Sequence, residues 1–182
     1  MRNFLIFIFL ICFTTKASAS IKSIIIQNLL NTKNFSFNFE QNINGKLESG
    51  NCIIEYPKKI FCKYDLKNKK VLISNGRSLV IKTNSSYYIY PLEKTPLNLI
   101  LDKKFLIGKI KTLKKRIIDK SLVNFKFLEN DTEINIFFDK NSSNLIGWQT
   151  VDIYQNLSIT FLSSITKNRV LEENLFRLPK KN

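Results

Sequence analysis

The amino-acid sequence predicts one mainly β domain, an antiparallel sheet curled toward a barrel with helical segments over its open side. Segments in which apolar and polar residues alternate recur along most of the chain. Two segments with helical spacing interrupt them, one near the start and one in the middle. A single antiparallel sheet of many strands curls, and it then needs a cover for its concave side.

The chain begins with the pattern of a secretory signal peptide. Arg2 supplies a positive charge, residues 4–13 form an apolar run, and Ala17-Ser18-Ala19 is a small-x-small cleavage site. The run is shorter than the roughly 20 apolar residues that span a membrane, although an uncleaved anchor is the alternative. We therefore predict cleavage after Ala19 and export of the mature chain.

Cys12 lies inside the apolar run, but lipidation there is not expected. A lipoprotein signal needs a small residue just before its cysteine, and Ile11 stands in that place. Residues 1–19 are thus assigned to the signal peptide. Residues 20–182 form a single domain, which is long enough to bury a core of its own.

The mature part should open with a helix and a strand. Ser20 can cap a helix whose apolar residues recur at helical spacing over residues 21–29. The strand "FSFNFEQ" then places Phe35, Phe37 and Phe39 on one face. Three phenylalanines on one face must be covered, either by a packed core or by a ligand.

A hairpin with two cysteines follows, in "GNCIIEYPKKIFCKYD". Alternation places Cys52 and Ile54 on the inner face of the first strand, and a turn of three residues, 56–58, would place Cys52 opposite Cys62. Neighbouring strands are close enough for a disulfide, and an even number of cysteines in an exported chain favours one. The alternative is a redox pair, which lacks the CxxC spacing and a helix N-terminus.

The rest of the chain continues as strands around one helical insertion. Asn75-Gly76 marks a hairpin with a type I′ turn over residues 69–83. In "TPLNLILDKKFLIGKI" the period changes: Thr95 caps, Pro96 takes the first helical position, and an apolar stripe follows. Strands then return, and "VLEENLFRLP" closes the chain.

Composition excludes several classes of function. The net charge is +15, but the lysines are spread along the chain and accompany many Asn, Ile and Phe residues, as AT-rich coding would produce. Nucleic-acid binding is therefore not expected. The densest basic cluster, residues 112–120, is interpreted as a solvated face or loop. The chain has no histidine, and without the usual catalytic motifs we expect neither an enzyme nor a metal or cofactor site.

These segments together resemble the LolA-type outer-membrane lipoprotein carriers, the periplasmic lipoprotein chaperones. "FSFNFEQ" is similar to the family's Phe-x-x-x-Phe-x-Gln strand, and "GNCIIEYPKKIFCKY" to its hairpin around a proline. "LISNGRSLVIK", "TPLNLIL", "NLIGWQTVD" and "LFRLP" resemble the family's turn, Thr-Pro helix, late strand and C-terminal segment. The resemblance covers the mature chain from end to end.

The resemblance implies an incomplete antiparallel barrel, strongly curved and covered by an N-terminal helix and a short inserted helical segment. It implies a monomer in the periplasm that binds the acyl chains of lipoproteins in a hydrophobic cavity. The cargo would come from an inner-membrane lipoprotein-releasing ABC transporter and pass to an acceptor lipoprotein at the outer membrane. A sensor or structural lipid-binding domain on the same fold is the alternative. A role as the acceptor itself would need the lipidation signal that Ile11 argues against.

The resemblance also assigns residues, with one departure. The family has an arginine before the hairpin proline that holds the lid closed, and Tyr56 stands there, so its hydroxyl is the candidate for gating. Taken singly, each candidate cavity residue is of a kind that is more often plain core than ligand wall. The predicted acyl-binding residues are Phe35, Phe37, Phe39, Ile54, Ile60, Tyr64, Leu97, Ile100 and Leu101.

Overall fold

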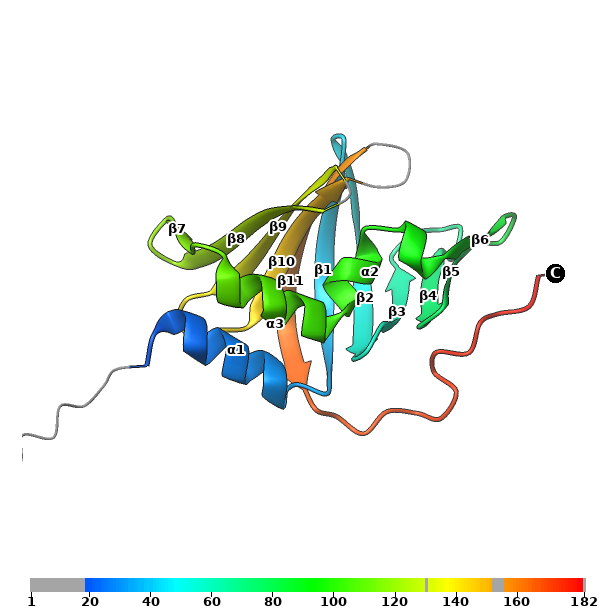
Figure 1. Cartoon of the computed structure of the whole chain (residues 1–182). Helices are drawn as coiled ribbons and strands as arrows, with labels where there is room; N and C mark the ends of the chain where they lie inside the picture. The colour runs from blue at the N-terminus through cyan, green and yellow to red at the C-terminus, as the bar shows by residue number, and fades with distance from the viewer. Residues whose placement is uncertain (1–18, 130, 152–155, 182) are drawn as a thin grey trace, which may run out of the picture.

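The computed structural model describes residues 19–129, 131–151 and 156–181 of the chain. Within these residues, eleven antiparallel strands form one sheet with the order β6-β5-β4-β3-β2-β1-β11-β10-β9-β8-β7. The order is linear between two edge strands, so the sheet curves strongly without closing on itself (Figure 1). This confirms the predicted fold class. Of the predicted signal peptide, residues 1–18 lie outside the described residues.

Helices cover one side of the sheet (Figure 1). They are α1 (Ile21–Asn31), α2 (Leu97–Leu101) and α3 (Lys103–Thr112), with a 3-10 turn η1 (Leu92–Lys94) before α2. The strands are β1 (Asn34–Ile43), β2 (Lys46–Glu55), β3 (Lys59–Tyr64), β4 (Val71–Asn75), β5 (Ser78–Lys82), β6 (Tyr87–Pro91), β7 (Arg116–Ile118), β8 (Leu122–Glu129), β9 (Thr132–Asp139), β10 (Leu145–Val151) and β11 (Leu157–Lys167).

Helix α1 and strand β1 follow the predicted pattern. The Ser20 hydroxyl accepts a hydrogen bond from the Ser23 N–H at 3.2 Å, so Ser20 is the N-cap. All three phenylalanines of β1 are buried on the concave face. β1 lies in the middle of the sheet, between β2 and β11. The apolar face of β1 is therefore at the centre of the molecule.

The hairpin of β4 and β5 is confirmed, but its turn is not the predicted type I′. Asn75 is the last residue of β4, and the two central turn residues are Gly76 and Arg77. Of the two, only Gly76 has a positive φ, of +96°, which is the pattern of a type II′ turn. The Asn75 side chain instead accepts hydrogen bonds from the N–H groups of Arg77 and Ser78. The prediction was wrong because the strand pairing places Gly76, and not Asn75, at the first central position, where glycine favours a type II′ turn.

The helical insertion also differs in detail from its prediction. Thr95 does not cap α2: its hydroxyl donates to the Leu92 carbonyl at 2.8 Å and closes η1, while Pro96 occupies the N-cap position. The insertion is two helices, because Asp102 ends α2 and caps α3 by accepting from the Phe105 N–H. Helices α2 and α3 together are called the lid below.

The C-terminal segment, residues 168–181, passes along the outer side of the sheet (Figure 1). The Tyr87 hydroxyl donates to the Pro179 carbonyl, and the Lys59 ammonium lies over the Phe176 ring. Ile73 and Val80 are buried but do not belong to the main core cluster, because they point to this outer side. The segment thus helps to cover a small second core.

Candidate functional site

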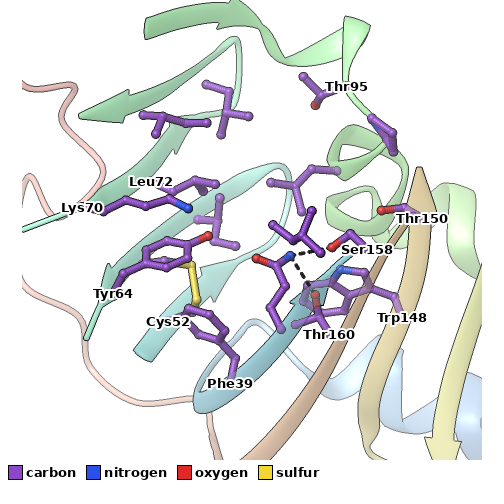
Figure 2. Close-up of a pocket in the computed structure, with 18 of the residues that line it drawn as sticks. Phe39, Cys52, Tyr64, Lys70, Leu72, Thr95, Trp148, Thr150, Ser158 and Thr160 are labelled. Atoms are coloured by element: carbon purple, nitrogen blue, oxygen red, sulfur yellow. Dashed lines mark hydrogen bonds between the residues drawn. A yellow bond between two sulfur atoms is a disulfide. The ribbon is translucent and has the colours of Figure 1, made fainter. Parts of the chain in front are cut away.

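A cavity of about 440 Å³ lies between the concave face of the sheet and the start of the lid (Figure 2). Strands from both halves of the sheet contribute to its wall, together with the turn that leads into α2. Most of this wall is apolar. The apolar and aromatic lining residues are Phe37, Phe39, Ile43, Cys52, Ile60, Cys62, Tyr64, Leu72, Leu79, Ile81, Tyr88, Tyr90, Pro96, Leu97 and Trp148.

The predicted acyl-binding residues divide between the cavity wall and the core. The lid meets the sheet at the hairpin turn, where the Lys58 N–H donates to the Leu101 carbonyl at 2.9 Å. Phe35 and Ile54 lie beside this turn in the core, whereas Phe37, Phe39 and Tyr64 lie farther along the strands and face the hollow. Ile60 pairs with Ile54 but also reaches the hollow. The residues in the wall are Phe37, Phe39, Ile60, Tyr64 and Leu97. Those buried in the core outside the wall are Phe35, Ile54, Ile100 and Leu101.

One side of the wall carries polar groups that the sequence analysis did not identify. The Gln41 side-chain amide donates to the hydroxyls of Ser158 and Thr160, at 2.8 and 3.1 Å. Thr150 and Trp148 lie beside them on β10 (Figure 2). Alternation could have found Gln41, since it continues the face of Phe35, Phe37 and Phe39. These groups could hold the carbonyl oxygens of an acyl ester or amide.

The opposite side of the wall carries Lys70, which lies 4.0 Å from the Tyr64 ring centre. Its ammonium donates to the carboxylate of Glu48, which is 3% exposed and also binds Lys46 at 3.0 Å. Burial raises the pKa of Glu48, but the hydrogen bonds and charges of Lys70 and Lys46 outweigh it and hold the pKa below its usual value. The carboxylate therefore stabilises the fold at neutral pH, and this contribution is lost as the pH falls through the lowered pKa.

A disulfide joins Cys52 and Cys62 in the cavity wall. The two residues are directly opposite each other in β2 and β3, as alternation and the three-residue turn place them. The loop that the bond closes is short, so its entropic contribution is at most about 3 kcal/mol. The bond fixes the register of the two strands where the lid meets the sheet.

The site has no feature of a metal centre. Within the described parts of the chain, no three His, Cys, Asp or Glu side chains come together in a way that could hold a metal ion. Across the same residues, no helix has both the length and the apolar character needed to cross a bilayer. What the cavity offers is an apolar hollow with a few polar groups, which is the usual form of a small-molecule or lipid site.

The family model for the outer membrane lipoprotein carrier protein LolA matches residues 30–179. The chain belongs to the LolA family. This match confirms the resemblance on which the acyl-binding residues were predicted. No curated protein sequence matches the chain.

Solved structures that are similar to this LolA-family chain share little sequence with it. A LolA superfamily protein from Nitrosomonas europaea has 8% identity and a TM-score of 0.44, covering 88% of this chain and 99% of its own. The lipoprotein LppX from Mycobacterium tuberculosis has 9% identity and a TM-score of 0.43, with 83% and 96% coverage. A DUF1329 family protein from Desulfovibrio piger has 8% identity and a TM-score of 0.44, covering 86% of this chain and 94% of its own. The family assignment rests on the sequence match and takes nothing from these structures.

Lysines hold the lid of this LolA-family chain on the sheet. Lys58 in the hairpin turn forms an ion pair with Asp102 at 3.4 Å, besides its main-chain bond to α2. Lys103 donates to the Thr32 carbonyl at the end of α1, at 2.8 Å. Lys22 of α1 donates to two carbonyls at the end of α3, at 2.8 Å each. These contacts lock the two helical parts of the cover to each other and to the turn.

Tyr56, the residue in place of the family's arginine, meets the lid through its ring. The Lys103 ammonium lies 5.4 Å from the ring centre, and Phe35 packs against the ring at 6.0 Å. The Tyr56 hydroxyl is buried and has no hydrogen-bond partner among the described residues. Burial raises the pKa of this hydroxyl well above its usual value. The hydrogen bond expected between the hydroxyl and the lid is therefore absent from the described part of the chain.

We predict that Tyr56→Phe stabilises the protein by about 1 kcal/mol, because a buried hydroxyl without a partner costs free energy that phenylalanine does not incur. Urea unfolding measures the change. Tyr87→Phe is the matched control, since the Tyr87 hydroxyl donates to Pro179 and its removal should be destabilising. If Tyr56→Phe destabilises as Tyr87→Phe does, the hydroxyl has a partner and a role in gating through a hydrogen bond regains support.

Proposed function

We propose that this protein is a periplasmic carrier of lipoproteins, which holds the acyl chains of its cargo in the cavity beneath the lid. The observation that carries the proposal is the 440 Å³ cavity itself, an apolar hollow beside the start of the lid in a LolA-family chain. Burying each methylene of an acyl chain stabilises binding by about 0.8 kcal/mol. One chain of a dozen methylenes therefore supplies about 10 kcal/mol, enough to keep it out of water during transfer.

The size of the cavity limits what the closed form can hold. A methylene group occupies about as much space as a water molecule, about 30 Å³. The 440 Å³ hollow therefore accommodates a single chain of about 15 carbons. A cargo with two or three acyl chains requires the lid to move. Acyl binding must then favour the open form over the closed one by a few kcal/mol.

The polar groups in the wall fit the linkage of the anchor. Acyl chains of lipoproteins are attached through ester and amide groups, whose carbonyl oxygens need donors once they leave water. The hydroxyls of Ser158 and Thr160 accept from the Gln41 amide and can donate their own protons to a ligand inside an otherwise apolar wall. They would orient the polar end of the anchor, while the chains extend along the apolar residues.

The proposed route begins and ends at membranes. The predicted signal peptide would bring the chain to the periplasm, where it would take acylated lipoproteins from an inner-membrane ABC transporter and deliver them to the outer membrane, to an acceptor lipoprotein where one exists. The proposal contains binding and release but no chemical step. A binding domain that never hands over its ligand is the outcome to be distinguished by experiment.

The test uses Trp148, the chain's single tryptophan, which lies in the cavity wall. An apolar dye that accepts Trp148 emission by energy transfer is loaded, and a triacylated lipopeptide is titrated in against the unacylated peptide. We expect displacement at micromolar concentration or below by the acylated form alone. Equal displacement of the dye by both peptides, or no displacement, would contradict the carrier proposal. A sensor or structural domain on the same fold would then be favoured.

A pair of variants locates the site. Leu72→Phe enlarges a side chain in the wall and should weaken lipopeptide binding about tenfold by filling the hollow. Leu47→Phe makes the same change where the side chain is 75% exposed on the outer side and should leave binding unchanged. If both variants bind alike, the dye and the lipopeptide occupy another site.

A further inference from the structure

A dense group of positive charges lies in helix α3 of the lid and in the residues that follow it. Residues 103–120 contain eight Lys or Arg side chains and a single acidic one, Asp119. The sequence alone favours a solvated loop for part of this segment. In the structure it comprises α3, the connection that follows and the edge strand β7. The segment therefore belongs to the helices over one side of the sheet and to one edge of the sheet (Figure 1).

Helix α3 divides its charge and its apolar residues between two sides. Leu106, Ile107 and Ile110 are buried against the sheet. Lys104 and Lys111 are exposed, and their spacing of seven places them on the same, outward side of the helix. The outer side of α3 is thus basic from its first turn to its last.

Most of these cations have no ion pair within the described structure. Lys109 pairs with Glu129 at 2.7 Å, and Lys103 donates to main-chain carbonyls, so neither is available to a partner. The Arg116 charge also acts on Glu133, which itself pairs with Lys126 at 2.6 Å. The exposed cations, called the basic lid face below, are Lys104, Lys111, Lys114, Lys115, Arg116 and Lys120.

An apolar side chain lies among these charges. Ile117 is in the edge strand β7, directly after Arg116, and is 45% exposed. The β7–β8 hairpin projects at the end of α3 (Figure 1). Surfaces that bind at the headgroup layer of a bilayer combine basic residues with exposed apolar side chains. Ile117 and the cations around it have this combination.

We propose that the basic lid face docks on a membrane surface rich in anionic phospholipids. Clusters of four to eight lysines or arginines are sufficient for such binding, with no pocket for a particular headgroup. The cations, mostly lysines as in the rest of the chain, act as hydrated point charges, which suit the diffuse potential of an anionic surface. Docking this face would bring α3 and the β7 edge of the sheet against the bilayer. The inference stands on charge and exposure and does not require an occupied cavity.

The test is co-sedimentation of residues 19–182, which include the whole described fold, with vesicles that contain 30% phosphatidylglycerol or phosphatidylcholine alone. We expect binding only to the anionic vesicles, and its loss in 1 M salt, where the screening length falls to about 3 Å. Absence of binding to the anionic vesicles at low salt would overturn the proposal. Because no acylated ligand is present, failure here leaves the dye-displacement result on the cavity untouched.

Matched charge reversals separate a local surface from overall charge. Each lysine near an anionic membrane contributes about fivefold in binding, so Lys114→Glu with Lys115→Glu should weaken it by about thirtyfold or more. Lys67→Glu with Lys69→Glu makes the same change in exposed residues between β3 and β4, on the other half of the sheet, and should have little effect. Equal losses in the two double variants would show attraction by net charge alone and would overturn the proposed face.

Two further variants control for misfolding and report whether β7 contacts the membrane. Lys104→Gln with Lys111→Gln removes charge from the exposed side of α3 and should also weaken binding, with thermal unfolding unchanged. Ile117→Trp combined with Trp148→Phe places the single tryptophan on β7, and its emission should shift to the blue on anionic vesicles but not on neutral ones. An unshifted emission with bound protein would place the contact elsewhere and contradict the proposal.

Discussion

Replacing Ile100 by aspartate is expected to release the lid while the sheet remains folded. Ile100 is fully buried in α2, and a carboxylate there has to be desolvated without a partner. The penalty is about 4 kcal/mol or more, which the few hydrogen bonds and ion pairs that hold the lid cannot offset. Hydrogen exchange should show faster exchange of residues 97–112, by about a thousandfold, with β1 and β2 still protected.

Leu30→Asp is the control for this variant. Leu30 lies on the other covering helix, α1, but is half exposed, so the same chemical change should alter exchange little. If Ile100→Asp exposes β1 as much as the lid, the lid and the sheet unfold as one unit. Opening by lid movement would then lose its physical basis, and the cavity of the closed form would set the size of the cargo.

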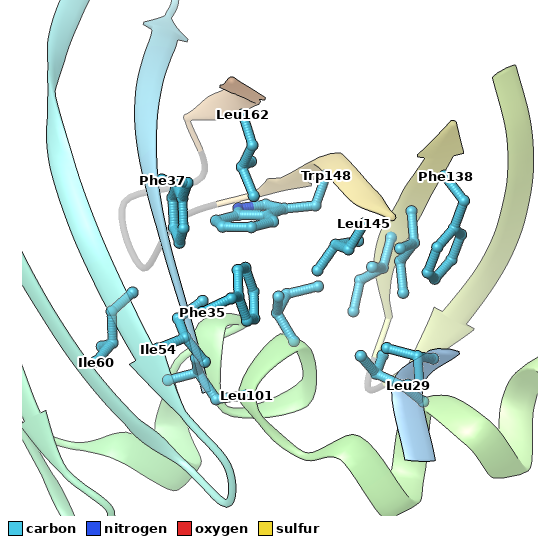
Figure 3. Packing of buried hydrophobic residues seen from close by; sticks show 14 of the residues in the cluster. Leu29, Phe35, Phe37, Ile54, Ile60, Leu101, Phe138, Leu145, Trp148 and Leu162 are labelled. Atoms are coloured by element: carbon cyan, nitrogen blue, oxygen red, sulfur yellow. The ribbon is translucent and has the colours of Figure 1, made fainter. Parts of the chain in front are cut away.

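Phe37→Ala is expected to lower the free energy of unfolding by about 3–5 kcal/mol. Phe37 is buried in β1, stacks on Phe35 with ring centres 5.3 Å apart, and meets the edge of Trp148 at 6.3 Å (Figure 3). Alanine removes both ring contacts and enlarges the hollow beside Trp148. Urea unfolding followed by Trp148 emission measures the loss and reports the change around the tryptophan.

Phe161→Ala provides the comparison on the opposite face of the sheet. Phe161 stacks on Phe137 across Gly147 but is 50% exposed, so its loss should cost about 1 kcal/mol. Similar losses for the two variants would contradict the placement of Phe37 at the centre of the interior. The same pair also tests the question raised by the sequence, since a residue that is only ligand wall should contribute less to stability than one that is core.

Local patterns predicted the strands and the hairpin well. Alternation of apolar and polar residues placed Phe37 and Ile60 on the inner face. Pairing the two strands across a turn of three residues placed Cys52 opposite Cys62. These features depend on the two-residue period of a strand and on neighbours along the chain. Such information is contained in a short piece of sequence, so it can be read without knowledge of the whole fold.

The division between cavity and core could not be predicted in this way. Ile54 and Ile60 pair with each other in β2 and β3, yet only Ile60 reaches the hollow. The difference depends on where the lid rests, which the Lys58 contacts to Leu101 and Asp102 decide. A lysine in a basic chain carries no signal that would single it out for this role.

Polar residues inside the fold were missed for a related reason. Glu48 continues the inner face of β2, but a carboxylate is assigned to solvent unless its partners are known. Its partner Lys70 comes from the start of β4, after a connection whose path the sequence does not define. Charge pairing across distant segments is a property of the folded chain.

The position of β1 has a consequence for how the chain is made. β1 pairs on one side with β2, which follows at once, and on the other side with β11, the last strand of the sheet. During synthesis the second edge of β1 stays bare until nearly the whole chain has emerged, with three phenylalanines beside it. A chain cut short before residue 157 would keep that edge open, and open edges with apolar faces invite aggregation. Fidelity in completing the polypeptide is therefore as important to this protein as any single contact in the finished fold.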